Sequence, residues 1–227
     1  MPGKHPTFFQ KRNFKELNDC GWTVLSFDGK DDSLLRMAAA LGIPIACQSN
    51  YPIIQQLTPH QNSSKSGISF SKVFGTGGFP LHTDLAHWPL PARYVLLADV
   101  GISHSRPTFV LSQSNFLAKF DEADIGHSVW KVPGPMGSFL CSMNFKALNR
   151  NWLRFDPLCM QPQNEAARAI INANKSIQYS PIQVDWSQNL VLVIDNWLML
   201  HGRGGSSVND TNHRVLKRIL IENKERS

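Results

Sequence analysis

Short runs of β-branched and aromatic residues divide the C-terminal two thirds of the chain. Seven such runs follow residue 67, separated by Gly, Pro and Asn turns, and they cover 68–74, 93–100, 128–132, 139–143, 177–186, 190–194 and 215–221. Short strands separated by turns are typical of a sandwich or jelly roll rather than of alternating βαβ units. Helical patterns interrupt them only near 112–120 and at 163–172, behind Pro162. We therefore expect a mainly β fold with flanking helices.

The N-terminal third predicts fewer elements. Residues 24–27 predict a strand, and Asp32 and Ser33 are expected to cap a helix over 34–41 that ends at Gly42. The stretch 48–67 is polar and rich in Ser, Asn and Gln, which predicts a long loop that acts as a lid. Neither a linker nor an internal repeat divides the sequence, so we expect one domain over residues 1–227.

Composition excludes several classes of protein. The 227 residues are 42% hydrophobic, which is ample for a folded core. The net charge of +6 is concentrated at the ends, because residues 1–18 carry four basic and one acidic group and residues 210–227 carry five basic and three acidic groups. Such a distribution is typical of solvated tails, so nucleic acid is not the expected partner.

The sequence also bears on the compartment. No run of 18 apolar residues is present, so we expect no membrane span, and no apolar segment follows the basic start as in a secretory signal. The cysteines form no CxxC pair, which argues against a disulfide framework or a thiolate zinc site; they are Cys20, Cys47, Cys141 and Cys159. We expect a cytoplasmic protein.

The triplet His82-Thr83-Asp84 is the first candidate for chemistry. On a strand, residues two apart point the same way, so His82 and Asp84 are expected to bind one ion together. His201, after the strand-like run and before Gly202, is the best third ligand. Two imidazoles and one carboxylate match the facial triad of non-haem Fe(II), although zinc also accepts this set. The remaining histidines of interest have no matched partner and are expected to make ordinary hydrogen bonds: His87, His104, His127 and His213.

Two of the arginines that follow His201 are candidates for binding a ligand. Arg214 lies thirteen residues after His201 and opens the run 215–221, so an adjacent strand would carry it into the same cavity. The planar guanidinium is suited to a dicarboxylate, because it makes two charge-assisted hydrogen bonds to one carboxylate. Arg218 has the same strand parity as Arg214, whereas Lys217 should face the other way.

Four segments together resemble a known family. They are FPLHTD (79–84), PARYVLL (91–97), DNWLMLHGR (195–203) and HRVLKR (213–218), and their order and spacing resemble the Fe(II)/2-oxoglutarate-dependent dioxygenases. The most similar branch is the taurine-dioxygenase and clavaminate-synthase-like group. The resemblance covers about residues 68–222, which are the expected core of the domain, and it implies a double-stranded β-helix, the cupin-like jelly roll.

The resemblance also implies roles for individual residues. His82, Asp84 and His201 match the iron ligands, and Arg214 matches the arginine that binds the far carboxylate of 2-oxoglutarate. Thr108 stands where the family usually has a threonine that helps to hold that carboxylate, although 105–107 replaces the glycine pair that often precedes it. Arg218 matches a position that contacts the substrate anion in sulfonate-oxidising relatives. The retained Asp84 favours hydroxylation over chlorination.

The expected function is therefore hydroxylation of an unactivated C–H bond with Fe(II), 2-oxoglutarate and O2, releasing succinate and CO2. By analogy with this branch, the expected substrate is a small molecule such as an amino acid or a related metabolite. One alternative is a dioxygenase that modifies nucleic acid or protein. Another is a jelly-roll metal-binding or regulatory protein without turnover, which would not consume 2-oxoglutarate. The sequence does not indicate the oligomeric state.

Overall fold

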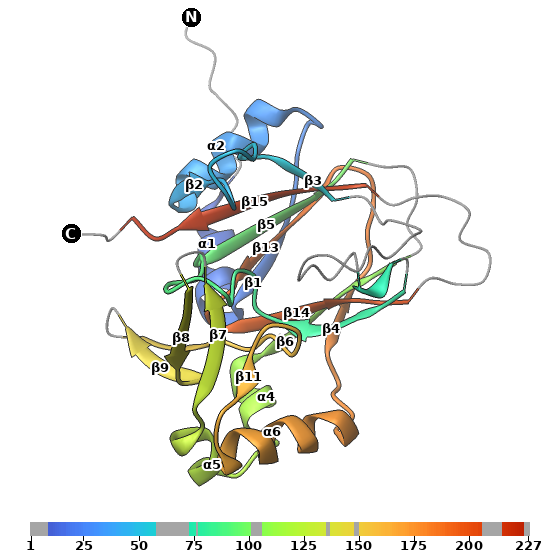
Figure 1. Cartoon of the computed structure of the whole chain (residues 1–227). Helices are drawn as coiled ribbons and strands as arrows, with labels where there is room; N and C mark the ends of the chain where they lie inside the picture. Colours follow the sequence, from blue (N-terminus) through green and yellow to red (C-terminus); the bar gives the residue numbers. More distant parts are fainter. Residues whose placement is uncertain are drawn as a thin grey trace, which may run out of the picture.

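A six-stranded antiparallel sheet joins strands from both ends of the chain. The structure is a computed structural model that describes residues 9–57, 73–75, 77–100, 106–134, 137–147, 150–205 and 215–224. The sheet has the order β1-β13-β5-β15-β2, with β3 also paired to β15 (Figure 1). Its strands are β1 (Trp22–Ser26), β2 (Ile43–Ile45), β3 (Gln55–Leu57), β5 (Tyr94–Asp99), β13 (Leu190–Asp195) and β15 (Leu216–Glu222).

A second antiparallel sheet packs against the first. Its order is β12-β6-β14-β4, with β4 (Phe79–His82), β6 (Thr108–Ser112), β12 (Ile182–Val184) and β14 (Met199–Arg203). One buried cluster contains residues from both sheets, among them Val95, Val110 and Leu192. The predicted mainly β jelly roll is therefore confirmed.

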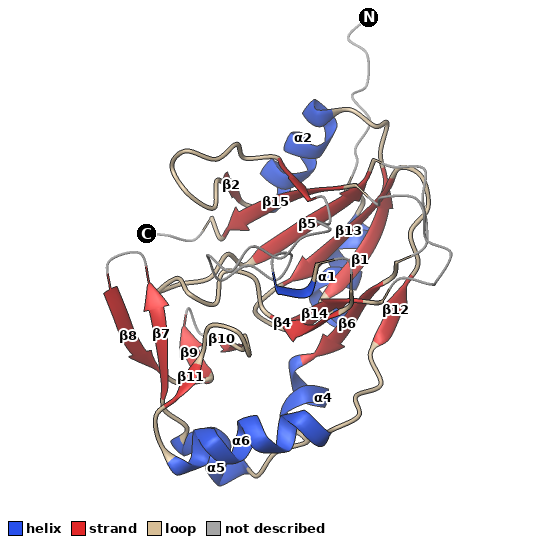
Figure 2. Ribbon diagram, turned by 45° about the vertical axis from the view of Figure 1, so that its right-hand side comes forward, coloured by secondary structure: helices blue, strands red, loops and turns tan. Residues whose placement is uncertain are grey.

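Smaller elements cover the outer face of the second sheet (Figure 2). They are the sheet β11-β7-β8, the hairpin β9-β10 and three helices, with bounds β7 (Trp130–Gly134), β8 (Gly137–Cys141), β9 (Asn144–Ala147), β10 (Arg150–Leu153), β11 (Gln161–Pro162), α4 (Gln113–Leu117), α5 (Glu122–His127) and α6 (Glu165–Ser176). Leu111 and Leu200 from the second sheet share a buried cluster with Trp130 and Phe116. Within the described ranges, every helix is too short or too polar to cross a bilayer.

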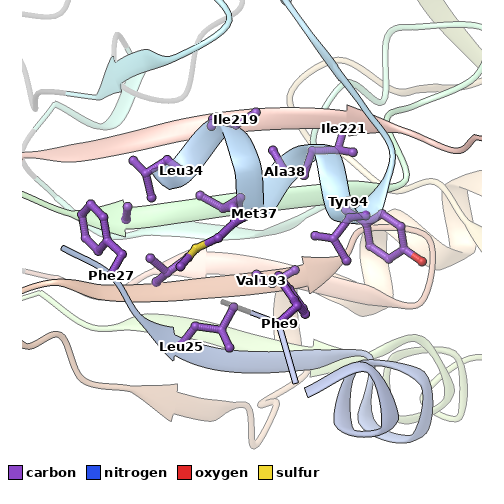
Figure 3. Close-up of a cluster of buried hydrophobic side chains, with 14 of the residues drawn as sticks. Phe9, Leu25, Phe27, Leu34, Met37, Ala38, Tyr94, Val193, Ile219 and Ile221 are labelled. Atoms are coloured by element: carbon purple, nitrogen blue, oxygen red, sulfur yellow. The ribbon is translucent and has the colours of Figure 1, made fainter. Parts of the chain in front are cut away.

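Period-2 alternation explains how β5 is buried on both faces. Its outward residues Leu96 and Ala98 share a buried cluster with Leu34 and Met37 of helix α2 (Asp31–Leu41). Figure 3 shows Leu34 and Met37 within this cluster. Successive strand residues point to opposite faces, so Val95 and Leu97 instead join the cluster between the sheets. Helix α1 (Lys11–Cys20) contributes Leu17 to the outer cluster.

Some local expectations were wrong. Helix α2 begins at Asp31 after Lys30, so Asp32 lies in the first turn and does not cap the helix. In the run 68–74, only Val73 and Phe74 are described, and they lie in a helical turn and not in a strand. The predicted lid 48–67 contains strand β3, and its residues 58–67 lie outside the described part. The run 177–186 forms a strand only at Ile182–Val184.

The strands missed by the sequence patterns are short or polar. They include β2, β3 and the hairpin β9-β10, whose residues carry no clear alternation of apolar and polar side chains. Pairing with a neighbouring strand, which is not visible in a local window, stabilises them.

We expect the packing of helix α2 against the six-stranded sheet to contribute much of the stability of the fold. Met37 is 1% exposed, so Met37→Ala should lower the free energy of unfolding by about 2–5 kcal/mol, because it leaves a cavity in the core. Leu140 is 65% exposed, and Leu140→Ala should have little effect. Urea unfolding of both variants tests this; an equal loss in the two would contradict the packing described here.

Candidate metal centre and cavity

Two neighbouring strands place two histidines opposite each other. Strand β14 pairs with β4 so that His201 lies directly across from His82, and their ring centroids are 4.5 Å apart. Asp84 follows in the turn after β4; its Oδ1 lies 3.7 Å from His82 Nε2 and its Oδ2 lies 3.7 Å from His201 Nε2. One ligand atom from each residue lies within 4.8 Å of the other two. The three predicted ligands therefore converge on one point.

The two imidazoles are suited to bind a cation. His82 Nδ1 lies 3.0 Å from the carbonyl oxygen of Pro80, which can only accept, so Nδ1 donates this hydrogen bond and Nε2 is the ring nitrogen directed at Asp84. Burial, followed by the nearby His82, lowers the pKa of His201 to about 3. His201 is therefore neutral at physiological pH, which is the form that binds metals.

The third group is a buried carboxylate that stays ionised. Burial raises the pKa of Asp84, but the charge of Arg218 is the largest opposing influence, and this pKa lies well below its usual range. Two imidazoles and one carboxylate form a donor set that fits Fe(II), and zinc fits it as well.

A cavity of about 250 Å³ opens beside these three residues. Its walls include the apolar side chains of Phe79, Leu85, Leu97 and Leu216. Several polar groups also line it: Gln48, His87, Thr108, Asp156, Arg203 and Arg218. A concave site with apolar walls and a few convergent polar groups is typical of a small-molecule site.

Solved structures resemble the chain over almost its whole length. Asparagine oxygenase, in complex with Fe(II), 2S,3S-3-hydroxyasparagine and succinate, has a TM-score of 0.72 and 14% identity, with 93% of this chain and 78% of that chain covered. The chain has the fold of the Fe(II)/2-oxoglutarate-dependent oxygenases. No family model and no curated protein sequence matches the chain.

Two further structures share this oxygenase fold. The non-haem iron oxygenase OrfP, in complex with Fe, succinate and (3S)-hydroxy-L-Arg, has a TM-score of 0.70 and 20% identity, covering 93% of this chain and 79% of that one. PvcB from Pseudomonas aeruginosa, an Fe, alpha-ketoglutarate dependent oxygenase from an isonitrile synthetic pathway, has a TM-score of 0.67 and 16% identity, covering 99% and 86%.

Asn196 fixes the backbone of Asp84. This fully buried side chain lies in the turn between β13 and β14; its Oδ1 accepts a hydrogen bond of 2.8 Å from the Asp84 amide, and its Nδ2 donates to the carbonyls of Asp84 and Ala92 at 2.9 Å. Because strand β4 ends at His82, the facing of His82 and Asp84 does not come from strand periodicity, as the sequence had indicated. It comes from this turn and from Asn196.

Thr83 connects the same turn to the segment that carries Asp156. Its amide donates to the carbonyl of Phe155 at 2.8 Å, and the amide of Phe155 donates to Thr83 Oγ1 at 3.1 Å. The next residue, Asp156, is thereby held beside the cavity, and its Oδ1 accepts hydrogen bonds from the amides of Leu158 and Cys159.

The residues predicted to bind 2-oxoglutarate are described only in part. Thr108 lines the cavity, and its Oγ1 accepts a hydrogen bond of 3.1 Å from Trp186 Nε1, so its hydroxyl hydrogen can still be donated to a ligand. Arg214 lies outside the described residues. Thr108 begins β6 and pairs in register with Arg203, which places it near the ligand strand β14.

Arg218 lines the cavity but contacts the metal-site carboxylate. Its Nη1 lies 3.1 Å from both oxygens of Asp84, and its Nε and Nη2 donate to Gln55 Oε1 at 3.0 and 2.6 Å. The predicted opposite facing of Arg218 and Lys217 is confirmed, because Lys217 pairs with Asp31 away from the cavity, whereas the predicted shared facing of Arg214 and Arg218 stays a prediction. The predicted contact of Arg218 with substrate stays a prediction.

Arg203 holds the segment that leads into β4. Its Nε and Nη2 donate to the carbonyl of Gly77, Nη2 also donates to that of Gly75, and the guanidinium lies over the ring of Phe79 at 4.4 Å. Burial, followed by nearby Arg106, lowers the pKa of Arg203 to about 10, so it remains charged at neutral pH.

Sequence reasoning did not assign site roles to Gln55, His87, Asp156, Asn196 or Arg203. His87 was expected to have an ordinary hydrogen-bonding role, yet it lines the cavity. Asn196 and Arg203 lie inside a segment that resembles the oxygenases, so their position was a usable signal. Gln55 gave no signal, because only the pairing of β3 with β15 brings it to Arg218, 163 positions away.

Asn196→Asp tests the support of Asp84. The exchange keeps the size of the side chain but removes the two N–H donations, so we expect cobalt(II) affinity to fall about 10–100-fold, as for other outer-shell partners. Calorimetric titration measures the affinity. Asn172→Asp, at an exposed position of α6, is the matched control and should bind cobalt normally. Wild-type affinity in Asn196→Asp would exclude this role.

The pKa of His201 predicts a pH dependence of stability. The folded protein keeps His201 neutral down to about pH 3, whereas the unfolded chain protonates it near 6.5. Unfolding therefore takes up a proton below pH 6.5, so metal-free protein should lose stability as pH falls from 7 to 5, with this residue contributing up to about 1.4 kcal/mol per pH unit. Urea unfolding at several pH values, in the presence of a chelator, should show a smaller loss of stability per pH unit in His201→Gln than in the wild type. The same pH dependence in both proteins would contradict this prediction.

Proposed function

We propose that the protein is an Fe(II)/2-oxoglutarate-dependent oxygenase that hydroxylates an unactivated C–H bond of a small molecule, releasing succinate and CO2. The observation that carries this proposal is the convergence of His82, Asp84 and His201, all buried, at the wall of a cavity within an oxygenase fold. Bound iron would supply the chemistry with O2 that no side chain provides.

The side chains would bind and orient the organic ligands. In this proposal, the hydroxyl of Thr108 donates to the far carboxylate of 2-oxoglutarate, and Arg214 pairs with that carboxylate. Arg203 fixes the segment before β4, and so holds Phe79 at the cavity wall. The apolar walls exclude water from the reacting groups.

The cavity favours a small amino acid or a related metabolite as substrate. Its volume of about 250 Å³ is below the ~300–1,000 Å³ typical of drug-sized ligands. Arg218 and Asp156 both line it, and one cation and one anion suit the two charges of an amino acid. Two of the similar structures hold hydroxylated asparagine or arginine, which supports the same class here.

A cytoplasmic location also belongs to this proposal. The four cysteines are free, which is the state that a reducing compartment maintains. We propose a small-molecule partner rather than nucleic acid, in keeping with the nearly neutral centre of the chain.

Turnover without substrate tests the function. Fe(II) and 2-oxoglutarate added without air should produce a weak visible absorption band, and air should then yield succinate slowly. Asp84→Asn should reduce succinate formation more than about 100-fold, beyond the usual cost of losing an outer-shell partner. Asp185→Asn makes the same change at an exposed position and should leave the rate unchanged.

The other outcomes are informative. An absorption band without succinate from any metabolite mixture would favour the regulatory metal-binding protein. Failure to bind iron would overturn the proposed function.

A further inference from the structure

The guanidinium of Arg218 lies between Gln55 and the metal-site carboxylate. Strands β3 and β15 pair with Gln55 directly opposite Arg218, so the two side chains share one face of the sheet. Gln55 Oε1 accepts from Nε and Nη2, and Nη1 reaches both oxygens of Asp84 at 3.1 Å. The guanidinium is thus held with one edge on Gln55 and one nitrogen on Asp84.

Gln55 contributes position but no charge. Among the described residues, its buried Nε2 has no hydrogen-bond partner, so Arg218 is the contact that its side-chain amide makes. A neutral amide orients the guanidinium but leaves its positive charge intact. That charge is directed at Asp84.

Arg218 and a divalent metal ion would share one carboxylate. Both oxygens of Asp84 already face Nη1, and the same oxygens face His82 and His201. Two cations on one buried carboxylate repel each other strongly, because the surroundings screen charge poorly. Arg218 therefore opposes metal binding, while Asn196 holds the Asp84 backbone through hydrogen bonds that do not involve Arg218.

An anion in the cavity would relieve this opposition. Arg218 lines the cavity, and its contacts with Gln55 and Asp84 leave one N–H of Nη2 unused. Among the described residues that line the cavity, two are arginines and two are aspartates, so their formal charges cancel before a metal binds: Arg203, Arg218, Asp84 and Asp156. A bound divalent ion makes the cavity positive and so favours an anionic ligand.

We propose that Arg218, held by Gln55, couples the metal site to an organic anion in the cavity. A carboxylate or sulfonate that pairs with Arg218 reduces its hold on Asp84 and so raises the affinity for metal; the metal raises the affinity for the anion by the same factor. The coupling rests on the proposed metal site and adds a dependence of that site on the substrate anion.

Cobalt(II) titration of the purified protein, without turnover, tests the coupling. Arg218→Gln keeps a donor toward Asp84 but removes the charge, and Arg218→Met removes both; each should bind cobalt about tenfold more tightly than wild type, within the usual range of such couplings. Lys217→Met removes one charge from the other face of β15 and should not change the affinity. Equal or weaker binding in both Arg218 variants would overturn the proposal.

Methanesulfonate serves as an anion that pairs with arginine but coordinates metals poorly. At 200 mM, against sodium chloride of equal ionic strength, it should tighten cobalt binding severalfold in wild type and not in Arg218→Gln. No effect in wild type would overturn the coupling. 2-Oxoglutarate carries a keto-acid end that can itself coordinate cobalt. If the substrate supplies the coupled anion, the effect of 2-oxoglutarate on cobalt affinity should persist in Arg218→Gln; loss of that effect would identify the cosubstrate as the coupled anion.

Gln55→Leu tests the positioning role separately. The released guanidinium should leave Asp84 part of the time, so cobalt affinity should rise, by a smaller factor than in Arg218→Gln. Weaker binding would exclude Gln55 as the positioning residue, and circular dichroism checks the fold. If wild-type protein binds no cobalt, the proposed function fails too; if it binds cobalt and the Arg218 variants match it, only the coupling fails.

Discussion

The pairing of β4 with β14 is the constraint on which the site depends. It sets His82 across from His201 on adjacent strands of one sheet. A slip of one residue would turn one histidine to the opposite face and separate the pair. The register is secured because β14 also pairs with β6 along five consecutive residues, and because Leu200, beside His201, is fully buried on the outer face. Packing on one face of β14 therefore fixes chemistry on the other.

Much of this arrangement is predictable from the sequence. The short strand-like runs predict the β-sandwich. The positions of His82, Asp84 and His201, within segments that resemble oxygenases, predict the candidate ligands. Strand parity separates Arg218 from Lys217, because β15 is regular along its length. These features depend on period-2 patterns and local motifs, which a single sequence displays.

The supporting contacts are less visible. Gln55 reaches Arg218 only through the pairing of a three-residue strand, and the facing of Asp84 toward the histidines depends on a turn that Asn196 holds through the Asp84 amide and carbonyl. Local propensity does not encode such contacts across more than a hundred residues. Helix α2 shows a smaller, local error, since Asp32, which was expected to cap the helix, lies inside its first turn.

Stability and chemistry are concentrated in different parts of the molecule. The site gathers several polar and charged side chains in one poorly hydrated region: Asp84, Arg203, Arg218 and the two histidines. Burying such groups costs free energy even when each side chain has a partner. The cluster that joins α1, α2 and the outer face of the large sheet is apolar and offsets that cost. Strand β15 links the two, because Ile219 packs under α2 while its neighbour Arg218 reaches Asp84. The apolar cluster thus fixes strand β15, which carries Arg218. Among the described residues, Arg218 is the one cation in direct contact with Asp84.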